Sequence, residues 1–184
     1  MFRNYYSQAL QAKQDEIDGI AISSYDKNFD EVDARFVNIK ILDGNQFIFF
    51  TNYNSPKSKQ FNDRSQVACL IFWSSINLQI RIKATIKKLP FNISDNFFKK
   101  RALKKNALAI SSMQSEVIDS YESVESNYIH TLNTNDLKIR PSYWGGYQIT
   151  PYYFEFWTGH ELRLNKRDAF TLKNKTWKHN FLQP

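Results

Sequence analysis

The chain has 184 residues, of which 42% are hydrophobic and 16% aromatic, and its formal net charge is +7 at pH 7. This length fits one domain over residues 1–184, and the abundant aromatic residues with only five glycines exclude a low-complexity or fibrous protein. The positive charge favours an anionic partner, but it does not choose between nucleic acid, an acidic surface and a phosphorylated small molecule.

Cysteine usage and hydropathy bear on the compartment. The single cysteine, Cys69, lies in the apolar run "VACLIFW", so we expect a buried, inert thiol, and no disulfide can form within the chain. After the first residue there is no continuous apolar segment of signal-peptide or transmembrane length. We therefore expect a soluble protein of the reducing cytoplasm that does not bind a membrane.

The N-terminal part of the chain predicts one helix followed by strands. "YYSQALQAKQ" can form a short amphipathic helix, and "IDGIAISS" has the composition of a first strand. We expect "VDARFVNIKIL" and "QFIFFTN" to pair antiparallel, because "DGN" between them favours a hairpin turn at Asp43 and Gly44.

The next segments give a helix start and the clearest strand pattern. Ser55 and Pro56 in "SPKSKQFNDR" are typical of an N-cap and a first helical residue, which would place Lys57 at a helix N-terminus. "QVACLIFW" predicts a buried strand. In "INLQIRIKATIKKL" every second residue from Ile76 to Ile86 is apolar, so the intervening residues, Gln79 among them, should form a polar face.

Helical segments interrupt the strands before they resume. Residues 93–132 lose the strand pattern, and "ISDNFFKKRALKKNALA" and "SYESVESNYIHTL" predict helices. Strand signals return in "YYFEFW", "ELRLN", "AFTLK" and "TWKHNFL", with "KNK" as a turn. The sequence predicts a mainly β protein with helical insertions (α+β), built as an antiparallel barrel.

Several common chemistries lack their sequence signatures. The three histidines are far apart in the sequence and have no zinc-ligand spacing with the lone cysteine, so we expect no bound metal. The Walker phosphate loop, the dinucleotide G-x-G-x-x-G and the G-x-S-x-G elbow do not occur. If the chain is an enzyme, a cofactor is expected to carry the chemistry.

Four basic clusters adjoin predicted strands. They are Arg35 with Lys40, Lys57 with Lys59, Arg101 with Lys104 and Lys105, and Arg163 with Arg167. One such cluster alone is ordinary solvated surface. Together they indicate a phosphate ester, because Arg holds phosphate with two parallel hydrogen bonds and a helix N-terminus adds partial positive charge near Lys57.

Seven pieces in order carry a resemblance to a known family. They are "RFVNIK", "FFTNYNSPKS", "NLQIRIKATIKKLP", "SMQSEV", "YWGGYQITPYYFEFWTG", "RLNKR" and a terminal "FLQP". Over about residues 5–184 the chain resembles the pyridoxamine 5'-phosphate oxidase family. The resemblance implies a split β-barrel homodimer that binds FMN between its subunits. It also implies hydride transfer from the substrate's C4' carbon to FMN, reoxidation by dioxygen and formation of pyridoxal 5'-phosphate.

The resemblance also implies the site residues. Those for the cofactor are Arg35, Phe36, Val37, Asn38, Ile39, Lys40, Phe50, Thr51, Lys57, Gln79, Gln114, Ser115, Trp157 and Arg167. Gln114 and Ser115 are expected to reach the flavin from the other subunit. Those for the substrate are Lys40, Phe97, Arg101, Lys105, Arg163 and Asn165, and the last two take the catalytic positions.

The substrate set departs from the family pattern. Phe97, Lys105 and Asn165 replace a Tyr, a Ser and a His, and Pro56 replaces one basic residue of the FMN phosphate site. Phe97 cannot make the hydrogen bond of a tyrosine, and Asn165 cannot carry a proton near neutral pH. A second reading is therefore an FMN-binding protein of the same scaffold with a different substrate. A third, a nucleic-acid binder, rests on net charge alone, and we expect no nucleic acid.

Structural roles stand beside the functional ones. Trp157 could be barrel core, Gly145 and Gly146 could supply a permissive turn, and Gln79 could be an exposed strand residue. Ser115 with Glu116 could mark a helix start, and the cluster from Arg101 to Lys105 could be one solvated helix face.

Overall fold

The computed structural model describes residues 1–44 and 46–184. Its helices are α1 (Phe2–Gln11), α2 (Pro56–Asp63), α3 (Phe91–Lys100), α4 (Leu103–Ser111) and α5 (Tyr121–Thr134), with one 3-10 turn, η1 (Ser74–Ile76). Its strands are β1 (Gly19–Asp26), β2 (Glu31–Asn38), β3 (Ile41–Asp43), β4 (Gln46–Asn52), β5 (Gln66–Trp73), β6 (Leu78–Lys88), β7 (Trp144–Thr158), β8 (Lys166–Lys173) and β9 (Thr176–Phe181).

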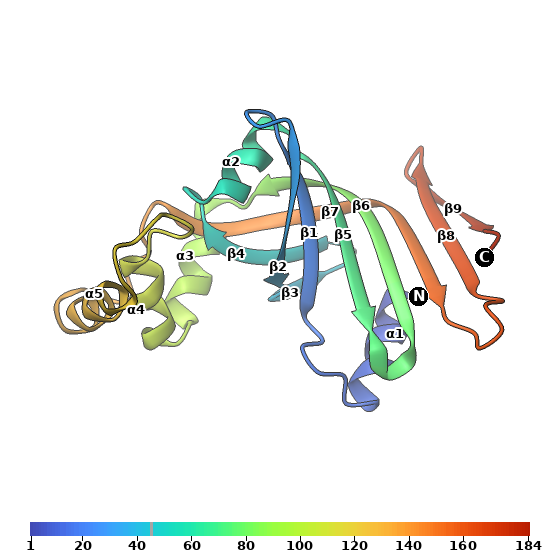
Figure 1. Ribbon diagram of the computed structural model, residues 1–184, viewed down its shortest axis with the longest axis horizontal. Coiled ribbons are helices and arrows are strands. Elements are labelled where there is room, and N and C mark those ends of the chain that lie inside the picture. Colours follow the sequence, from blue (N-terminus) through green and yellow to red (C-terminus); the bar gives the residue numbers. More distant parts are fainter. Residues whose placement is uncertain (45) are drawn as a thin grey trace.

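The strands form one antiparallel sheet that curls into a split barrel. Its order is β2-β1-β5-β6-β7-β4-β3, and β8 and β9 continue from the far end of β7. Figure 1 shows β7 crossing the whole molecule, from the group of α3, α4 and α5 at one end to the β8–β9 hairpin at the other. The predicted α+β architecture and the antiparallel split barrel are confirmed.

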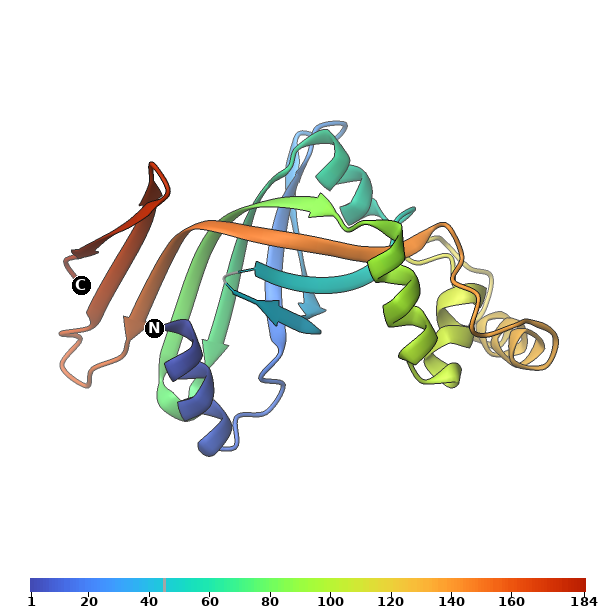
Figure 2. The same cartoon turned by 180° about the vertical axis from the view of Figure 1, so that it is seen from behind.

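Strand β6 follows the alternation expected from its sequence. Leu78, Ile80, Ile82, Ala84 and Ile86 are buried in the core, while Arg81, Lys83 and Thr85 point outward. The core continues into α1, where the Phe2 ring lies 5.0 Å from Phe47 and 5.5 Å from Trp73. Seen from behind, α1 lies against one end of β5 and β6, away from α2 (Figure 2). Burial raises the pKa of the Cys69 thiol to about 12, as expected of an inert core cysteine.

The predicted pairing of the early strands is partly wrong. Ile41–Asp43 pairs with β4, but β2 pairs along its whole length with β1 instead. The hairpin between β1 and β2 has no glycine or proline; it turns at Asp30, which has a φ of +54°, and at Asp26, whose carboxylate accepts from the Asn28 N–H at 2.9 Å. The predicted "DGN" turn includes Asn45, which lies outside the described residues.

Other boundaries also differ from the prediction. "ELRLN" is an exposed turn, in which Arg163 has a φ of +59°, and the helix expected over 93–109 breaks into α3 and α4 around Arg101. The "KNK" turn is confirmed, since Asn174 and Lys175 both have positive φ between β8 and β9. Ser55 does mark the start of α2, but its hydroxyl donates to the Asn52 carbonyl and accepts no backbone N–H of the helix. No helix among the described residues is long and apolar enough to span a membrane.

The glycine pair of "WGG" lies inside strand β7 and does not form a turn. A Cβ at Gly145 would lie 2.3 Å from the Tyr53 hydroxyl, and one at Gly146 would lie 2.5 Å from Leu89 and 2.9 Å from Phe50. The Tyr53 hydroxyl also donates to the Gly146 carbonyl at 3.1 Å. Glycine is therefore required by close packing, because it lets Tyr53, Phe50 and Leu89 approach the backbone of β7.

Gly145→Ala should lower the free energy of unfolding by about 1–3 kcal/mol, because the added methyl group forces Tyr53 out of a packed position. Urea unfolding of the variant measures this loss. Thr85→Ala, at an exposed position of the neighbouring strand, is the control and should stay within about 0.5 kcal/mol of the parent. Equal stabilities for Gly145→Ala and the parent would contradict the packing argument.

Candidate functional site

A cleft of about 560 Å³ gathers most of the residues predicted to bind the cofactor. It is bounded by the end of β2, by β4, by the start of α2 and by the segment after α4. Its lining residues are Asp33, Arg35, Phe36, Val37, Asn38, Lys40, Phe50, Thr51, Pro56, Lys57, Arg101, Gln114 and Ser115. Residues more than eighty positions apart in sequence, such as Asp33 and Ser115, thus line the same cleft within a single chain.

Arg35 is held in this cleft by three polar neighbours. Its guanidinium donates to the Ser24 hydroxyl at 2.7 Å and to the Gln60 side-chain oxygen at 3.1 Å, and it forms an ion pair with Asp33. These contacts fix the plane of the guanidinium on β2, so its position does not depend on a ligand. A fixed, charged fork of this kind suits an anionic oxygen group.

Lys57 lies in the first turn of α2 and is only 7% exposed. Its ammonium donates to the Ser55 hydroxyl at 3.1 Å and to the Gln114 side-chain oxygen at 3.0 Å. Burial, together with the positive charge of Arg35 and against the opposing charge of Asp33, lowers the pKa of Lys57 to about 8. A buried cation beside a second cation, at a helix start, is stabilised when an anion arrives, so these residues fit a phosphate group.

Gln114 belongs to the same half of the site as Lys57. Its side-chain oxygen accepts from the Thr51 hydroxyl at 3.0 Å as well as from Lys57, and Ser115 lines the same cleft with a φ of +70°. Gln114 and Ser115 were expected to reach the flavin from the other subunit. In this structure the hydrogen bonds join Gln114 to Thr51 and Lys57 of its own chain, so both residues line the cleft of that chain.

Gln79, Trp157 and Arg167 form a second group, away from this cleft. Gln79 is the register partner of Trp157, and Trp157 is the register partner of Arg167, so the three lie in one row across β6, β7 and β8. Thr51 of the cleft pairs with Gly145, near the other end of β7. Gly145 and Trp157 are separated by about 40 Å of extended strand. Figure 1 shows these two ends of β7 on opposite sides of the molecule.

The predicted substrate residues divide in the same way. Lys40 and Arg101 line the cleft, and Lys105 lines an adjoining cavity of about 210 Å³ that shares Arg101, Thr51 and Gln114. The Phe97 ring stacks on Phe50, with 3.8 Å between ring centroids. The Arg101 guanidinium lies 5.1 Å from the centroid of Trp144 and donates to the Lys105 carbonyl at 2.6 Å. This corner is thus an aromatic stack edged by cations.

Arg163 and Asn165 belong to the exposed turn between β7 and β8. The Asn165 side-chain oxygen accepts from the His160 N–H at 3.0 Å, and the Arg163 side chain is exposed. Both residues are therefore on the side of Trp157 and Arg167. Asn165 braces the turn in this structure, and His160 lies in the same turn.

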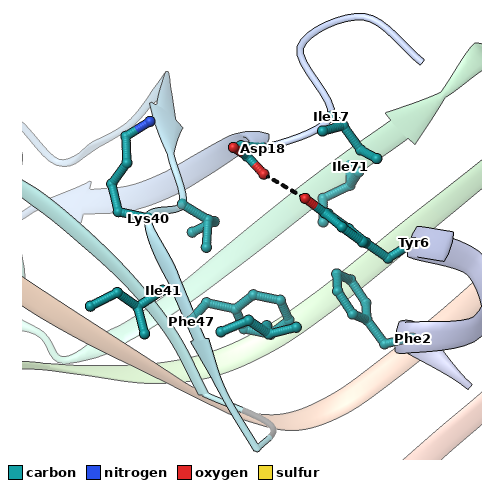
Figure 3. Close-up of a pocket in the computed structure, with 10 residues that line it drawn as sticks. Phe2, Tyr6, Ile17, Asp18, Lys40, Ile41, Phe47 and Ile71 are labelled. Carbon is teal, nitrogen blue, oxygen red and sulfur yellow. Dashed lines mark hydrogen bonds between the residues drawn. The ribbon is translucent and has the colours of Figure 1, made fainter. Parts of the chain in front are cut away.

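A separate cavity of about 290 Å³ lies under α1, and the predicted cofactor residue Ile39 faces it and not the cleft. Figure 3 shows Phe2, Tyr6 and Phe47 gathered in this cavity and the Tyr6 hydroxyl bonded to Asp18, at 3.0 Å. Lys40 borders both spaces, and its ammonium is directed away from the aromatic rings (Figure 3). The segment around Lys40 is therefore the wall between the two cavities.

Sequence reasoning missed the residues that hold the predicted ones in place. Asp33 lies two positions before Arg35 on one strand face, a spacing that could have suggested the ion pair. Ser24 and Gln60 were not detectable, because they meet Arg35 from a different strand and a helix. Glu155, which contacts Arg167, required the β7–β8 register to be recognised.

Comparison with known proteins places the chain in a family. Residues 144–184 match the model of the pyridoxine 5'-phosphate oxidase C-terminal dimerisation region. The chain is 32% identical over 185 residues to the pyridoxine/pyridoxamine 5'-phosphate oxidase of Herminiimonas arsenicoxydans, and 34% identical over 188 residues to that of Leptospira biflexa. In each case all of this chain aligns with 87% of the relative.

Two solved structures share the fold. PhzG from Burkholderia lata 383, in complex with tetrahydrophenazine-1-carboxylic acid, matches all of this chain and 90% of its own with a TM-score of 0.93 and 22% identity. A pyridoxamine 5'-phosphate oxidase-related, FMN-binding protein from Nostoc punctiforme matches all of this chain and 97% of its own with a TM-score of 0.81 and 11% identity. Given the identity to the curated relatives over most of their length, the chain belongs to the pyridoxine/pyridoxamine 5'-phosphate oxidase family of FMN-dependent oxidoreductases.

Proposed function

We propose that the chain oxidises pyridoxine or pyridoxamine 5'-phosphate at C4' and forms pyridoxal 5'-phosphate. The observation that carries the proposal is the pairing of Arg35 with the buried Lys57 in a cleft bounded by a helix start, which suits the single phosphate of FMN. When bound, FMN supplies the hydride acceptor, and dioxygen then takes the two electrons. The chain's residues bind and align the reactants, because hydride transfer to a flavin depends on alignment more than on a protein base.

The residues of the cleft hold both the FMN cofactor and the substrate. Lys57, Arg35 and the Thr51–Gln114 pair bind the FMN phosphate end, and Lys40 and Arg101 attract the phosphate of the substrate. Arg163 and Asn165 cover the substrate from the turn between β7 and β8. The aromatic stack of Phe50 and Phe97 forms the apolar side of the pocket.

We infer that two copies of the chain complete each site. Lys57 and Trp157 lie near opposite ends of β7, farther apart than one FMN can bridge, so a single chain cannot bring both groups to the same flavin. In a homodimer, the row of Gln79, Trp157 and Arg167 from one copy can meet the cleft of the other copy. Two-fold symmetry then gives two complete FMN sites per dimer.

The outer face of the sheet supports this assembly. Phe36, Ala21, Leu70 and Arg81 are successive register partners, so their side chains share one face, and Phe72 lies beside Leu70 on it. Phe36 is 78% exposed and Phe72 is 56% exposed. Exposed apolar side chains that cluster on a sheet face are typical of a surface covered by a partner. The match of residues 144–184 to a dimerisation region agrees with this inference.

A second candidate function keeps the cofactor and changes the substrate. Phe97 is stacked on Phe50 and offers no hydroxyl to a phosphate, and Asn165 is engaged with His160. The PhzG structure holds a tetrahydrophenazine carboxylic acid on the same fold, so the scaffold accommodates a ligand without a phosphate. An aromatic carboxylate would find the same stack and the same cations in this chain.

FMN affinity should fall as the pH rises through 8. The bound phosphate requires the ammonium form of Lys57, whose pKa is about 8 in the free protein, so binding is full below pH 8 and weakens by up to about tenfold per pH unit above it. Fluorescence titration of FMN from pH 7 to 9 measures this. Lys57→Arg is the matched control, because a guanidinium stays charged and its profile should be flat. Parallel profiles for the two proteins would exclude Lys57 from the phosphate site.

Mixed dimers should test the shared site. Lys57→Ala and Trp157→Ala should each weaken FMN binding when expressed alone. After the two variants exchange subunits in equal amounts, about a quarter of all sites should regain wild-type FMN affinity, since half of random dimers are mixed and each carries one intact site. Recovery is measured by flavin retained on gel filtration. No recovery, with mixed dimers present by mass spectrometry, would place both groups in one subunit's site.

Restoring the family's substrate residues should improve turnover of the vitamin phosphates. Phe97→Tyr with Asn165→His should raise kcat/KM for pyridoxine 5'-phosphate by roughly two- to tenfold, because a lost hydrogen bond of this kind is worth about 0.5–1.5 kcal/mol. Phe91→Tyr, at an exposed helix start, is the control and should change nothing. Anaerobic bleaching of bound FMN reports reduction directly. If the wild type and the double variant both fail to bleach with FMN bound, the substrate is a different one.

A further inference from the structure

A buried carboxylate lies beside the second group of cofactor residues. Glu155, in the middle of the aromatic run of β7, is 2% exposed although it faces the outer side of the sheet. One carboxylate oxygen, Oε1, accepts from Arg167 Nε at 2.9 Å and from Arg167 Nη2 at 2.7 Å. The other, Oε2, accepts from Arg81 Nη1 and from the Tyr153 hydroxyl, each at 2.9 Å.

This cluster carries more positive than negative charge. Burial raises the pKa of Glu155, but the hydrogen bonds from Arg167 and Tyr153 and the charge of Arg81 outweigh it, so the pKa lies below its usual value. Glu155 is therefore ionised at neutral pH. One carboxylate balances one of the two guanidiniums, so the cluster presents a net positive charge on the sheet face that carries Trp157.

The geometry fixes Arg167 in particular. Its Nε and one terminal nitrogen are both committed to Glu155, and the other terminal nitrogen, Nη1, donates to the Gln183 carbonyl at 2.8 Å. The side chain thus has one orientation, alongside its register partner Trp157. A long, flexible side chain that is ordered before the ligand arrives loses less conformational entropy on binding.

We propose that Glu155 is a positioning residue for the cofactor: it holds Arg167 beside Trp157 and Gln79 in the orientation that meets the flavin. This inference rests on the proposed function, because it takes the row of Gln79, Trp157 and Arg167 as the second half of the FMN site. Glu155 itself touches no ligand. It acts through Arg167, and the aligned guanidinium offers positive charge to an electron-rich group.

The test is a double-variant cycle read out as FMN affinity. Glu155→Gln keeps the shape of the side chain and removes its charge, and it should raise the Kd for FMN at least tenfold. In an Arg167→Gln background the same change should raise the Kd less than threefold, because the side chain that Glu155 positions is already gone. Asp168→Asn is the matched control: it removes a β8 carboxylate that pairs with His179, and the Kd should stay within twofold of the parent.

Stability measurements separate positioning from folding. Breaking a buried ion pair is costly, so Glu155→Asp, which keeps the charge and retracts it by one methylene, is tested in the same cycle in case Glu155→Gln does not fold. Thermal melting of each FMN-free protein gives the structural loss. An unchanged Kd in folded Glu155→Gln or Glu155→Asp, or an equal rise in both backgrounds, would overturn the proposal. If wild-type protein binds FMN but oxidises no vitamin phosphate, the proposed reaction fails and this inference stands.

Discussion

The hydrogen bonding of strand β7 is the constraint on which the rest of the structure depends. One fifteen-residue strand pairs with β4 near its start, with β6 along most of its length and with β8 near its end. The register shift between Lys83 and Ala84 of β6 leaves Tyr152 unpaired next to Pro151, a residue that has no N–H to donate. Because this strand is continuous, the cleft and the row of Gln79, Trp157 and Arg167 are fixed at a distance from one another.

The two halves of the candidate site differ in how well their buried charges are compensated by neighbouring groups. In the cleft, Lys57 is buried close to Arg35 and its charge is poorly compensated, as its lowered pKa records. On the outer face, Glu155 is buried with two guanidiniums and a hydroxyl, and its charge is overcompensated. A bound anion would therefore compensate the positive charge of the cleft. The charged groups of the outer cluster already have partners, and these contacts order their own side chains.

Much of the fold could be predicted from local pattern, and the failures have physical causes. The bounds of β4 and β5 and the start of α2 follow from composition, a proline and an N-cap residue, all of which act over a few neighbours. "ELRLN" alternates like a strand but forms a turn, because Arg163 takes a left-handed conformation there. The pair Gly145–Gly146 resembles a turn in sequence but is set by Tyr53, Leu89 and Phe50, which pack onto it from distant positions.

The candidate site shows the same limit. Family resemblance brought together Arg35, Lys57, Thr51 and Gln114, which do line one cleft. It did not predict that Gln114 bonds Thr51 and Lys57 of its own chain, because motif order carries no information on which segments meet in space. Asp33, Ser24, Gln60 and Glu155 carry no motif, and their roles depend on the contacts they make with arginines. Supporting residues of this kind require the folded structure.

The projecting β8–β9 hairpin has a consequence for how the protein behaves on dilution. Among the described residues its backbone pairs with the rest of the sheet through the end of β7, and Phe181, at the end of β9 opposite the turn, is 80% exposed. A two-stranded ribbon is marginally stable without a covering surface. In the proposed dimer, the element that carries Arg167 is therefore ordered by association, and cofactor retention becomes linked to protein concentration by mass action. Loss of flavin on dilution and fraying of the C-terminal hairpin would then both report the same monomer–dimer equilibrium.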